Sequence, residues 1–308
     1  MAHHPFCRLI VPIADFVHEI FEAHFFLRKA ILQYSSLNAI KIIGLFLFVF
    51  FWPIFVEGDE RLLRVHFIDV GYGDAILLDY PGSAYLLIDA GPGTSDKKLV
   101  EYLLSLGIKA LDSVMITHPH KNHFGGLKLL VQKIPVGQVF VNEDHNGEEG
   151  YNELLSFLRK KNIPIRVLKK DDVLDIGVPG MNLSILHPGQ LSDDVNANSI
   201  VSWLTYGQTA FLFTSDIGEN VQDNLLRDFP GIKTADCVQI PHHGGNVSDR
   251  FAGYFLSPLY IVSTGANPWG KPIHESLQKL KDQILRTDQA GTIVIESDGQ
   301  RVKVLENK

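Results

Sequence analysis

The sequence predicts a layered α/β domain over residues 61–306, with an apolar segment ahead of it. The main observation is that short apolar stretches typical of strands alternate with amphipathic stretches typical of helices. No Pro/Gly/Ser-rich linker divides these residues, which favours one domain. The composition agrees, because 45% hydrophobic and 20% charged residues in a chain of 308 are an ordinary globular balance. Such a chain can bury a large core, which excludes a disordered or fibrous protein.

Charge and cysteine content exclude further classes. The 28 Lys and Arg against 35 Asp and Glu give a formal net charge of −7. This acidic balance argues against a protein that coats nucleic acid by bulk charge. Cys7 and Cys237 lie far apart in the sequence, so a disulfide scaffold and a cysteine-rich zinc site are not expected.

The elements can be placed in order along the domain. Apolar runs predict the first three strands at residues 63–70, 75–80 and 84–89. A helix at 95–106 ends at Gly107, a residue typical of helix C-termini. A short buried strand at 113–117 is followed by a helix at 124–132. The same patterns predict strands at 138–141, 165–168, 183–186, 200–206, 210–214, 237–240, 259–263, 292–296 and 302–305, and helices at 149–161, 219–229 and near 275–284.

The segment before the domain contains an uncharged apolar run at residues 42–56. Fifteen residues are few for a spanning helix and suit the apolar core of a secretory signal. Residues 37–60 are therefore predicted to be a signal peptide or membrane anchor, with a buried core helix as the alternative. Lys41 precedes the run and acidic residues follow it, which predicts an extracytoplasmic domain. Residues 1–36 are interpreted as an extension upstream of the true start, or as a cytoplasmic amphipathic stretch beside an anchor.

A histidine motif follows the strand predicted at 113–117. Residues 117–126 read THPHKNHFGG, which places His118, His120 and His123 within six residues. On a helix these positions would spread around the axis, but in an extended turn they can converge on one point. Neutral imidazoles that converge at a strand end suit an ion of the Zn²⁺ type. The alternative is a polar loop with incidental histidines.

Two later strands also end in polar groups. Asp216 follows the apolar strand at 210–214, where a carboxylate could bind a metal or simply cap a helix. His242 and His243 stand before a glycine pair after the strand at 237–240. The alternative for that pair is a turn with one surface histidine.

Together these motifs resemble the metallo-beta-lactamase fold, and most closely the extracytoplasmic hydrolase-like domain of the ComEC competence proteins. Residues 67–75, FIDVGYGDA, resemble that family's opening FLDVGQGDA, and residues 87–91 resemble its LIDAG. Residues 196–201 resemble its NENSLV, and residues 286–299 resemble its terminal strands. The resemblance covers about residues 63–305. It implies a four-layer αββα sandwich with the metal site at one edge of two packed sheets.

The resemblance also implies a ligand set. The first metal would take His118 and His120. The second would take the motif's carboxylate, His123 and a late histidine, and Asp216 would bridge the two ions. Asp74 would orient a ligand histidine or be an ordinary turn residue.

This chain departs from the family pattern at three positions. Asn122 stands at the motif's carboxylate, Ser215 at the glycine of TGD, and Lys271 at the late histidine of NRYGHP. Asn is a poor metal ligand, and Lys271 would bring a positive charge to the position where the second metal ion would bind. Lys271 could instead stand in for that ion and stabilise negative charge, and His274 could replace the lost ligand.

The function implied is an exported or membrane-anchored metal-dependent hydrolase. It would hold one or two Zn²⁺ or Mn²⁺ ions and act on a phosphodiester through a metal-bound hydroxide. Asp216 would orient the water, and His242 or His243 would contact the phosphate or protonate the leaving group. The substrate could be a nucleic acid or a small molecule, and no obligate protein partner is inferred.

Two alternatives remain open. One is a hydrolase for a lactone, a thioester or a phosphocholine ester, since one fold hosts many activities. The other is a non-catalytic binding module with a degraded metal site, which Asn122 and Lys271 favour. P-loop, GxSxG and HExxH motifs are absent from the sequence, so those enzyme classes are not expected.

Overall fold

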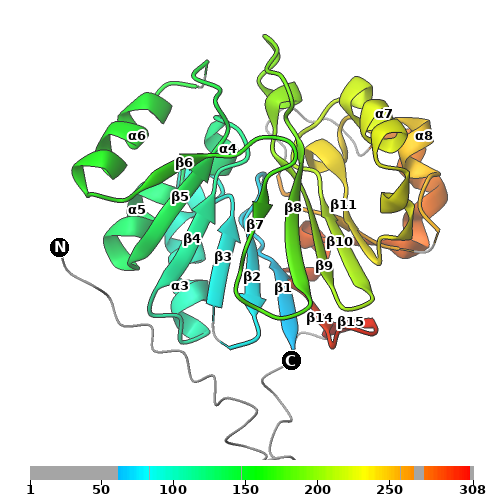
Figure 1. The fold of residues 1–308 in the computed structure, drawn as a ribbon, viewed down its shortest axis with the longest axis horizontal. Coiled ribbons are helices and arrows are strands. Elements are labelled where there is room, and N and C mark those ends of the chain that lie inside the picture. The colour runs from blue at the N-terminus through cyan, green and yellow to red at the C-terminus, as the bar shows by residue number, and fades with distance from the viewer. Residues whose placement is uncertain (1–61, 83, 147, 257, 267–273, 306–308) are drawn as a thin grey trace, which may run out of the picture. The chain divides into compact units, whose positions relative to one another are not determined.

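The computed structural model describes residues 62–305 except residues 83, 147, 257 and 267–273. Two β-sheets pack face to face, and helices cover both outer faces (Figure 1). This arrangement confirms the four-layer αββα expectation.

The first sheet has eight strands in the order β15-β14-β1-β2-β3-β4-β5-β6. The strands β3 to β6 pair in parallel, and the others pair antiparallel. The bounds are β1 Leu63–Phe67, β2 Ile76–Tyr80, β3 Ala84–Ile88, β4 Leu111–Met115, β5 Val136–Val141, β6 Ile165–Val167, β14 Ile293–Ser297 and β15 Val302–Leu305.

The second sheet has seven strands in the order β13-β12-β11-β10-β9-β8-β7. The strands β10 to β13 pair in parallel, and β7 to β10 pair antiparallel. The bounds are β7 Val173–Leu174, β8 Met181–His187, β9 Val201–Tyr206, β10 Thr209–Phe213, β11 Cys237–Gln239, β12 Leu259–Val262 and β13 Ile284–Arg286.

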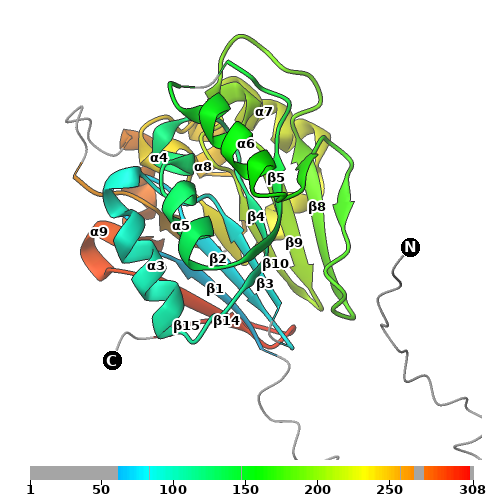
Figure 2. The same cartoon turned by 90° about the vertical axis from the view of Figure 1, so that its left-hand side faces the viewer.

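Helices form the two outer layers. Figure 2 shows α3, α5 and α6 in front of the first sheet, and Figure 1 shows α7 and α8 beside the second. The α-helices are α3 Asp96–Ser105, α4 Lys121–Phe124, α5 Leu127–Lys133, α6 Tyr151–Lys160, α7 Glu219–Asp228, α8 Asp249–Ala252 and α9 Thr287–Ala290. The 3₁₀ helices are η1 Gly93–Ser95, η2 Asn196–Asn198, η3 Pro230–Thr234, η4 Pro241–Gly244 and η5 Glu275–Gln283.

Side-chain periodicity builds the three apolar layers between these elements. In α6, Tyr151, Leu154, Leu155 and Leu158 recur at helical spacing and are buried against the first sheet. In β1, alternate residues such as Val65 and Phe67 point into the core between the sheets. A third cluster packs α7, α8 and η5 on the second sheet.

The structure differs locally from the expected elements. The helix predicted at 124–132 corresponds to α5, and a further short helix, α4, contains His123 and ends just before Gly125 and Gly126. A side chain at Gly126 would meet the Ala90 carbonyl oxygen at 2.2 Å, so the two loops can pack this closely only with glycine there. The helix expected near 275–284 is 3₁₀. Strands β7 and β13 and helices α8 and α9 were not predicted.

The predictions for residues 1–60, including the apolar run, fall outside the part of the chain that the structure describes. Within the described part, no helix has both the length and the apolar character needed to cross a membrane.

Candidate metal centre

The polar motifs meet at one edge of the sandwich, because the strands that precede them end there. His118 follows β4 and Asp216 follows β10, so the two sheets each bring loops to the same place. The carboxyl ends of neighbouring parallel strands share an edge, which is where ligands bind in such folds. His243, after β11, lies 3.6 Å from Asp216 through its Nε2 atom.

His118 and His120 form one half of the site. His118 Nε2 lies 2.9 Å from His120 Nδ1 and 3.8 Å from Asp216 Oδ2. Burial lowers the pKa of His118 well below its usual value, and the neighbouring His123 lowers it further. His118 is therefore a neutral imidazole, the form that binds a metal ion.

His123, Asp216 and His243 form the other half. Asp216 Oδ2 lies 3.2 Å from His123 Nε2 and 3.6 Å from His243 Nε2. With Asp74, these residues offer four ligand atoms within 4.8 Å of one another, and all four side chains are buried. The structure thus brings Asp216 between the two halves.

Charges within the cluster shift its pKa values in opposite directions. Burial alone would lower the pKa of His123, but the carboxylates of Asp216 and Asp89 outweigh it and raise that pKa well above 6.5. Burial alone would raise the pKa of Asp216, but His243 and His123 hold it well below its usual range. In the metal-free protein the His123 imidazolium and the Asp216 carboxylate therefore stabilise each other.

Asp89 anchors the cluster, although sequence reasoning gave it no role. Its carboxylate accepts hydrogen bonds of 2.8 Å from both the backbone N–H and the hydroxyl of Thr117. It also lies 2.7 Å from His123 Nδ1. The available signal was an Asp directly after a buried strand and before Ala90 and Gly91, within a stretch already noted for its resemblance.

Hydrogen bonds set the tautomers of the buried histidines. The Thr117 hydroxyl donates to Asp89, and the Ser215 hydroxyl lies 2.7 Å from Thr117 Oγ1. Both hydroxyl oxygens can then accept from His118 Nδ1, at 3.2 and 3.3 Å. His243 Nδ1 donates to the Ser263 carbonyl at 2.9 Å. In both rings this leaves the lone pair on Nε2, the nitrogen nearer to Asp216, as in metal sites whose ligand histidines are held by outer partners.

Asp74 belongs to the buried group and lies on the Nδ1 side of two of its histidines, and its predicted role in orienting a ligand stays a prediction. Its carboxyl is 3.7 Å from His123 Nδ1 and 4.0 Å from His243 Nδ1. Burial raises the pKa of Asp74 to about 6, and the two histidines partly oppose that shift.

The donor set fits a divalent cation. Two imidazole nitrogens and two carboxylate oxygens are the hard and borderline ligands that such ions take. Asp74 Oδ1 and Asp216 Oδ1 are buried and make no hydrogen bond to any described residue. A buried carboxylate oxygen without a partner is costly, and a bound cation removes that cost.

Asn122 contacts the second half of the site. Its Nδ2 lies 2.8 Å from His243 Nε2, and the ring's other nitrogen already donates to Ser263. The amide therefore donates to the single lone pair of His243, which a cation would otherwise use. The late-histidine position, Lys271, lies outside the described residues, and the structure places His243 beside His123 and Asp216.

His242 and His274 lie at the margin. His242 Nε2 is 4.0 Å from Asp216 Oδ2, and its side chain is 30% exposed. His274 Nδ1 lies 2.8 Å from Ser276 Oγ, and its side chain caps the start of η5. The structure therefore gives His274 a capping contact, and its role as a replacement ligand stays a prediction.

Backbone conformation at the site is unusual. Among the described residues, six that are not glycine have positive φ, and four of them are Asp89 (58°), Ser215 (51°), His242 (52°) and His243 (54°). Each such residue costs about 1–2 kcal/mol, so surrounding contacts must hold it. Strain concentrated in this way is typical of functional sites.

Ser215 allows a stability test of this strain. Ser215→Ala keeps the unfavourable φ and loses the hydroxyl contacts to Thr117 and His118, whereas Ser215→Gly loses the contacts and relieves the backbone. We expect the metal-free Gly variant to be more stable, with a free energy of unfolding about 1 kcal/mol larger than that of the Ala variant. Urea unfolding of both variants measures this difference. Equal stability, or a more stable Ala variant, would show that the strain at Ser215 is negligible.

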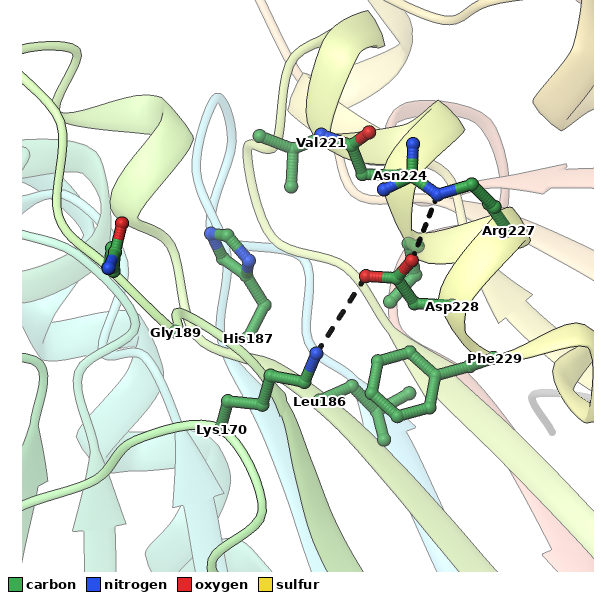
Figure 3. Close-up of a pocket in the computed structure, with 11 residues that line it drawn as sticks. Lys170, Leu186, His187, Gly189, Val221, Asn224, Arg227, Asp228 and Phe229 are labelled. Atoms are coloured by element: carbon green, nitrogen blue, oxygen red, sulfur yellow. Dashed lines mark hydrogen bonds and ion pairs between the residues drawn. The ribbon is translucent and has the colours of Figure 1, made fainter.

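Two pockets lie near these elements. One of about 400 Å³ adjoins the cluster, and Asn122 is among its lining residues. Another of about 350 Å³ lies between the end of β8 and α7 (Figure 3). There Asp228 lies 3.7 Å from Lys170 Nζ and 3.1 Å from Arg227 Nε, so one carboxylate offsets two cations. This second pocket shares no lining residue with the first.

Comparison with known proteins agrees with the motif resemblance. The model of the metallo-beta-lactamase superfamily matches residues 68–250, more than half of the chain. ComE operon protein 3 of Bacillus subtilis (strain 168) is 27% identical over 270 residues, which cover 80% of this chain and 34% of that protein. Competence protein ComA of Neisseria gonorrhoeae is 25% identical over 256 residues, again 80% and 34%. The chain thus spans about a third of the length of these relatives.

The solved structures to which the chain is similar include a diphosphatase from the PhnP family. It is 15% identical with a TM-score of 0.45, and the match covers 76% of this chain and 98% of that one.

Proposed function

Because the chain belongs to the metallo-beta-lactamase superfamily, we propose that it is a metal-dependent hydrolase of phosphodiesters or related esters. The observation that carries the proposal is the buried cluster of Asp74, His123, Asp216 and His243. Two of its carboxylate oxygens make no hydrogen bond to any described residue, and an ester hydrolase of this kind needs a cation there.

The ligands proposed fall into two overlapping groups. His118, His120 and Asp216 would hold one cation, and His123, His243 and Asp216 would hold a second. When bound, the cation supplies Lewis acidity that makes water a nucleophile near neutral pH and stabilises charge on the ester.

The chain's own groups do the remaining work. Asp89 orients His123, and the hydroxyls of Thr117 and Ser215 orient His118, so the ligand nitrogens need little reorganisation. His242 Nε2 lies 4.0 Å from Asp216 at the open side of the cluster, where it can donate a proton to the leaving oxygen.

A non-catalytic binding module is the second candidate. The observation that favours it is the hydrogen bond from the Asn122 amide to His243 Nε2. This bond occupies the lone pair of His243 and so weakens cation binding by the second group of ligands. In this case the cluster would hold at most one cation, and the pocket would bind a ligand without cleaving it.

We also propose that the domain acts outside the cytoplasm. The apolar run at 42–56 with Lys41 before it supports a signal peptide or anchor. The similarity to two competence proteins supports a nucleic acid as one candidate substrate.

The first experiment measures metal and hydrolysis together. The full chain, purified without a histidine tag, should carry at least about one equivalent of zinc or manganese by elemental analysis, the minimum that one of the two ligand groups requires. His118→Ala should lose that metal and the hydrolysis of bis(p-nitrophenyl) phosphate, because His118 supplies a ligand nitrogen. His145→Ala is the matched control, since His145 is an exposed histidine outside the cluster.

Thioester, lactone and phosphocholine ester substrates tested alongside would identify a different ester class. A protein that binds neither metal, even after incubation at millimolar concentration, would overturn the hydrolase proposal and favour the binding module.

A further inference from the structure

Tyr72 marks a place where this chain differs from the motif it resembles. Residues 67–75 read FIDVGYGDA, so Tyr72 stands where the family's opening pattern has Gln. The residue lies in the loop between β1 and β2, two residues before Asp74. An aromatic ring has replaced an amide beside the candidate metal centre.

The loop that carries Tyr72 is packed tightly between two others. A side chain at Gly73 would meet the Asn122 carbonyl oxygen at 2.3 Å, and one at Gly265 would meet Gly71 Cα at 2.5 Å. Backbone approaches this close require glycine at these positions. The backbone on both sides of Tyr72 is therefore held in place, which restricts where its side chain can point.

The Tyr72 ring contacts the cluster directly. Its centroid lies 4.5 Å from that of His243, with the two planes tilted by 58°. This is the spacing of a favourable aromatic contact. Any group bound against Tyr72 therefore lies one ring away from a proposed ligand of the cation.

Tyr72 also lines the pocket of about 400 Å³ that adjoins the cluster. Val70, Pro92 and Ala266 give this pocket apolar walls, and Asn122 joins it to the cluster. Lys121 and Glu148 also line the pocket, and the Glu148 carboxylate accepts a hydrogen bond of 2.8 Å from the Lys121 backbone N–H, so the pocket carries one cation and one anion. Apolar walls with an aromatic ring suit a flat apolar body.

We propose that Tyr72 is a specificity-determining residue that packs against a planar ring, aryl or heterocyclic, carried by the substrate. This inference rests on the proposed hydrolase function for the position of the ester. In this arrangement the ester lies at the cluster and the ring lies on Tyr72 and Pro92.

The test compares phosphate monoesters with and without a planar ring. Binding of thymidine 5′-phosphate, phenyl phosphate and ribose 5-phosphate to the full chain is measured by calorimetry, with and without added Zn²⁺. We expect at least one ring-bearing phosphate to bind roughly 10-fold or more tightly than ribose 5-phosphate, the gain typical of stacking on an aromatic side chain. Preference for thymidine 5′-phosphate would identify a nucleotide ring, and equal binding of phenyl phosphate would identify any aryl ring.

Three variants separate the ring from the hydroxyl. Tyr72→Phe should keep the preference, whereas Tyr72→Ala and Tyr72→Gln should lose it while leaving the affinity for ribose 5-phosphate and the metal content unchanged. In kinetics, Tyr72→Ala should raise KM for ring-bearing esters more than it lowers kcat.

Equal binding of phosphates with and without a planar ring by the wild type, or no binding of either, would overturn the role of Tyr72. So would an equal loss for both kinds of phosphate in Tyr72→Ala. Failure of the hydrolase proposal is distinguishable, because it appears as absent metal and absent ester cleavage, whereas the ring preference can be measured without metal.

Discussion

Replacing Asp216 by Asn is expected to abolish metal binding in both halves of the cluster and hydrolysis with it. One oxygen, Asp216 Oδ2, lies 3.2 Å from His123 Nε2, 3.6 Å from His243 Nε2 and 3.8 Å from His118 Nε2. An amide keeps the shape but loses the charge and presents a donor on one side. Loss of an outer partner typically costs about 10–100-fold in metal affinity, so losing this shared ligand should cost at least about 100-fold.

The measurement is zinc affinity by competition with a chromophoric chelator, together with the rate of phosphodiester cleavage. Asp79→Asn is the matched control, because Asp79 is a partly buried carboxyl on β2 outside the cluster. It should bind and cleave like the wild type. If Asp216→Asn kept its metal, Asp216 would not be the shared ligand.

The same substitution should change how the stability of the metal-free protein depends on pH. The pKa of His123 is raised well above 6.5 in the folded state, so its ion pairs are fully present below pH 6.5 and are lost as the pH rises through the folded pKa. The pKa of His118 is lowered, so His118 changes the stability only below pH 6.5. The pKa of Asp74 is raised to about 6, so Asp74 changes the stability only between about pH 4 and 6. Neither residue therefore affects the pH dependence of stability above pH 6.5.

Urea unfolding from pH 6.5 to 9 should therefore show the metal-free wild type losing stability, and Asp216→Asn losing less. Zinc binding at pH 7 should also displace the proton of His123, which calorimetry in two buffers of different ionisation enthalpy can detect. A wild type whose stability is flat over this range would contradict the ion pair.

The three histidines at 118, 120 and 123 were predicted to converge because an extended turn after a strand can bring them to one point, and the family resemblance added Asp216 to them. Each of these residues follows an apolar run long enough to identify as a strand. The structure bears out that they lie together, while their roles as ligands stay predictions. The elements that were missed, such as β7 with two residues and α8 with four, are too short to show a periodicity.

Asp89 and Tyr72 could not be assigned from pattern alone. The contact of Asp89 with Thr117 depends on β3 pairing in parallel with β4, with Leu87 opposite Val114, and on a positive φ at Asp89 itself. The position of Tyr72 depends on three loops distant in sequence that pack through glycines. The order of strands in a sheet and a positive φ at one residue produce no periodic pattern in a single sequence, so they could not be predicted from it.

The choice between His242 and His243 illustrates the same limit. Both residues have positive φ, at 52° and 54°, so the chain turns sharply and places the two rings differently. His243 is buried, with Nε2 3.6 Å from Asp216, whereas His242 is partly exposed at 4.0 Å. Adjacent histidines therefore suit different tasks, one as a ligand and one as a proton donor at the open side.

Asn122→Asp is expected to strengthen the second group of ligands more than any other single change within the described residues. In the wild type, the Asn122 amide lies 2.8 Å from His243 Nε2, whose ring donates through Nδ1 to Ser263. His243 has one lone pair, and the amide competes with a cation for it. A carboxylate cannot donate at neutral pH, so the substitution frees that lone pair and adds an anionic ligand.

We expect Asn122→Asp to bind a second equivalent of zinc at least about tenfold more tightly than the wild type, a gain that matches a new charged ligand beside a freed imidazole. Asn122→Ala separates the two contributions, because it frees His243 without adding a carboxylate and should give a smaller gain. Elemental analysis and zinc titration distinguish the three proteins. If Asn122→Asp gains metal and cleaves esters faster, the wild-type site is a weakened two-metal centre. If it binds the second zinc no better than the wild type, the Asn122 amide does not compete with a cation for His243, and the second group of ligands needs another explanation.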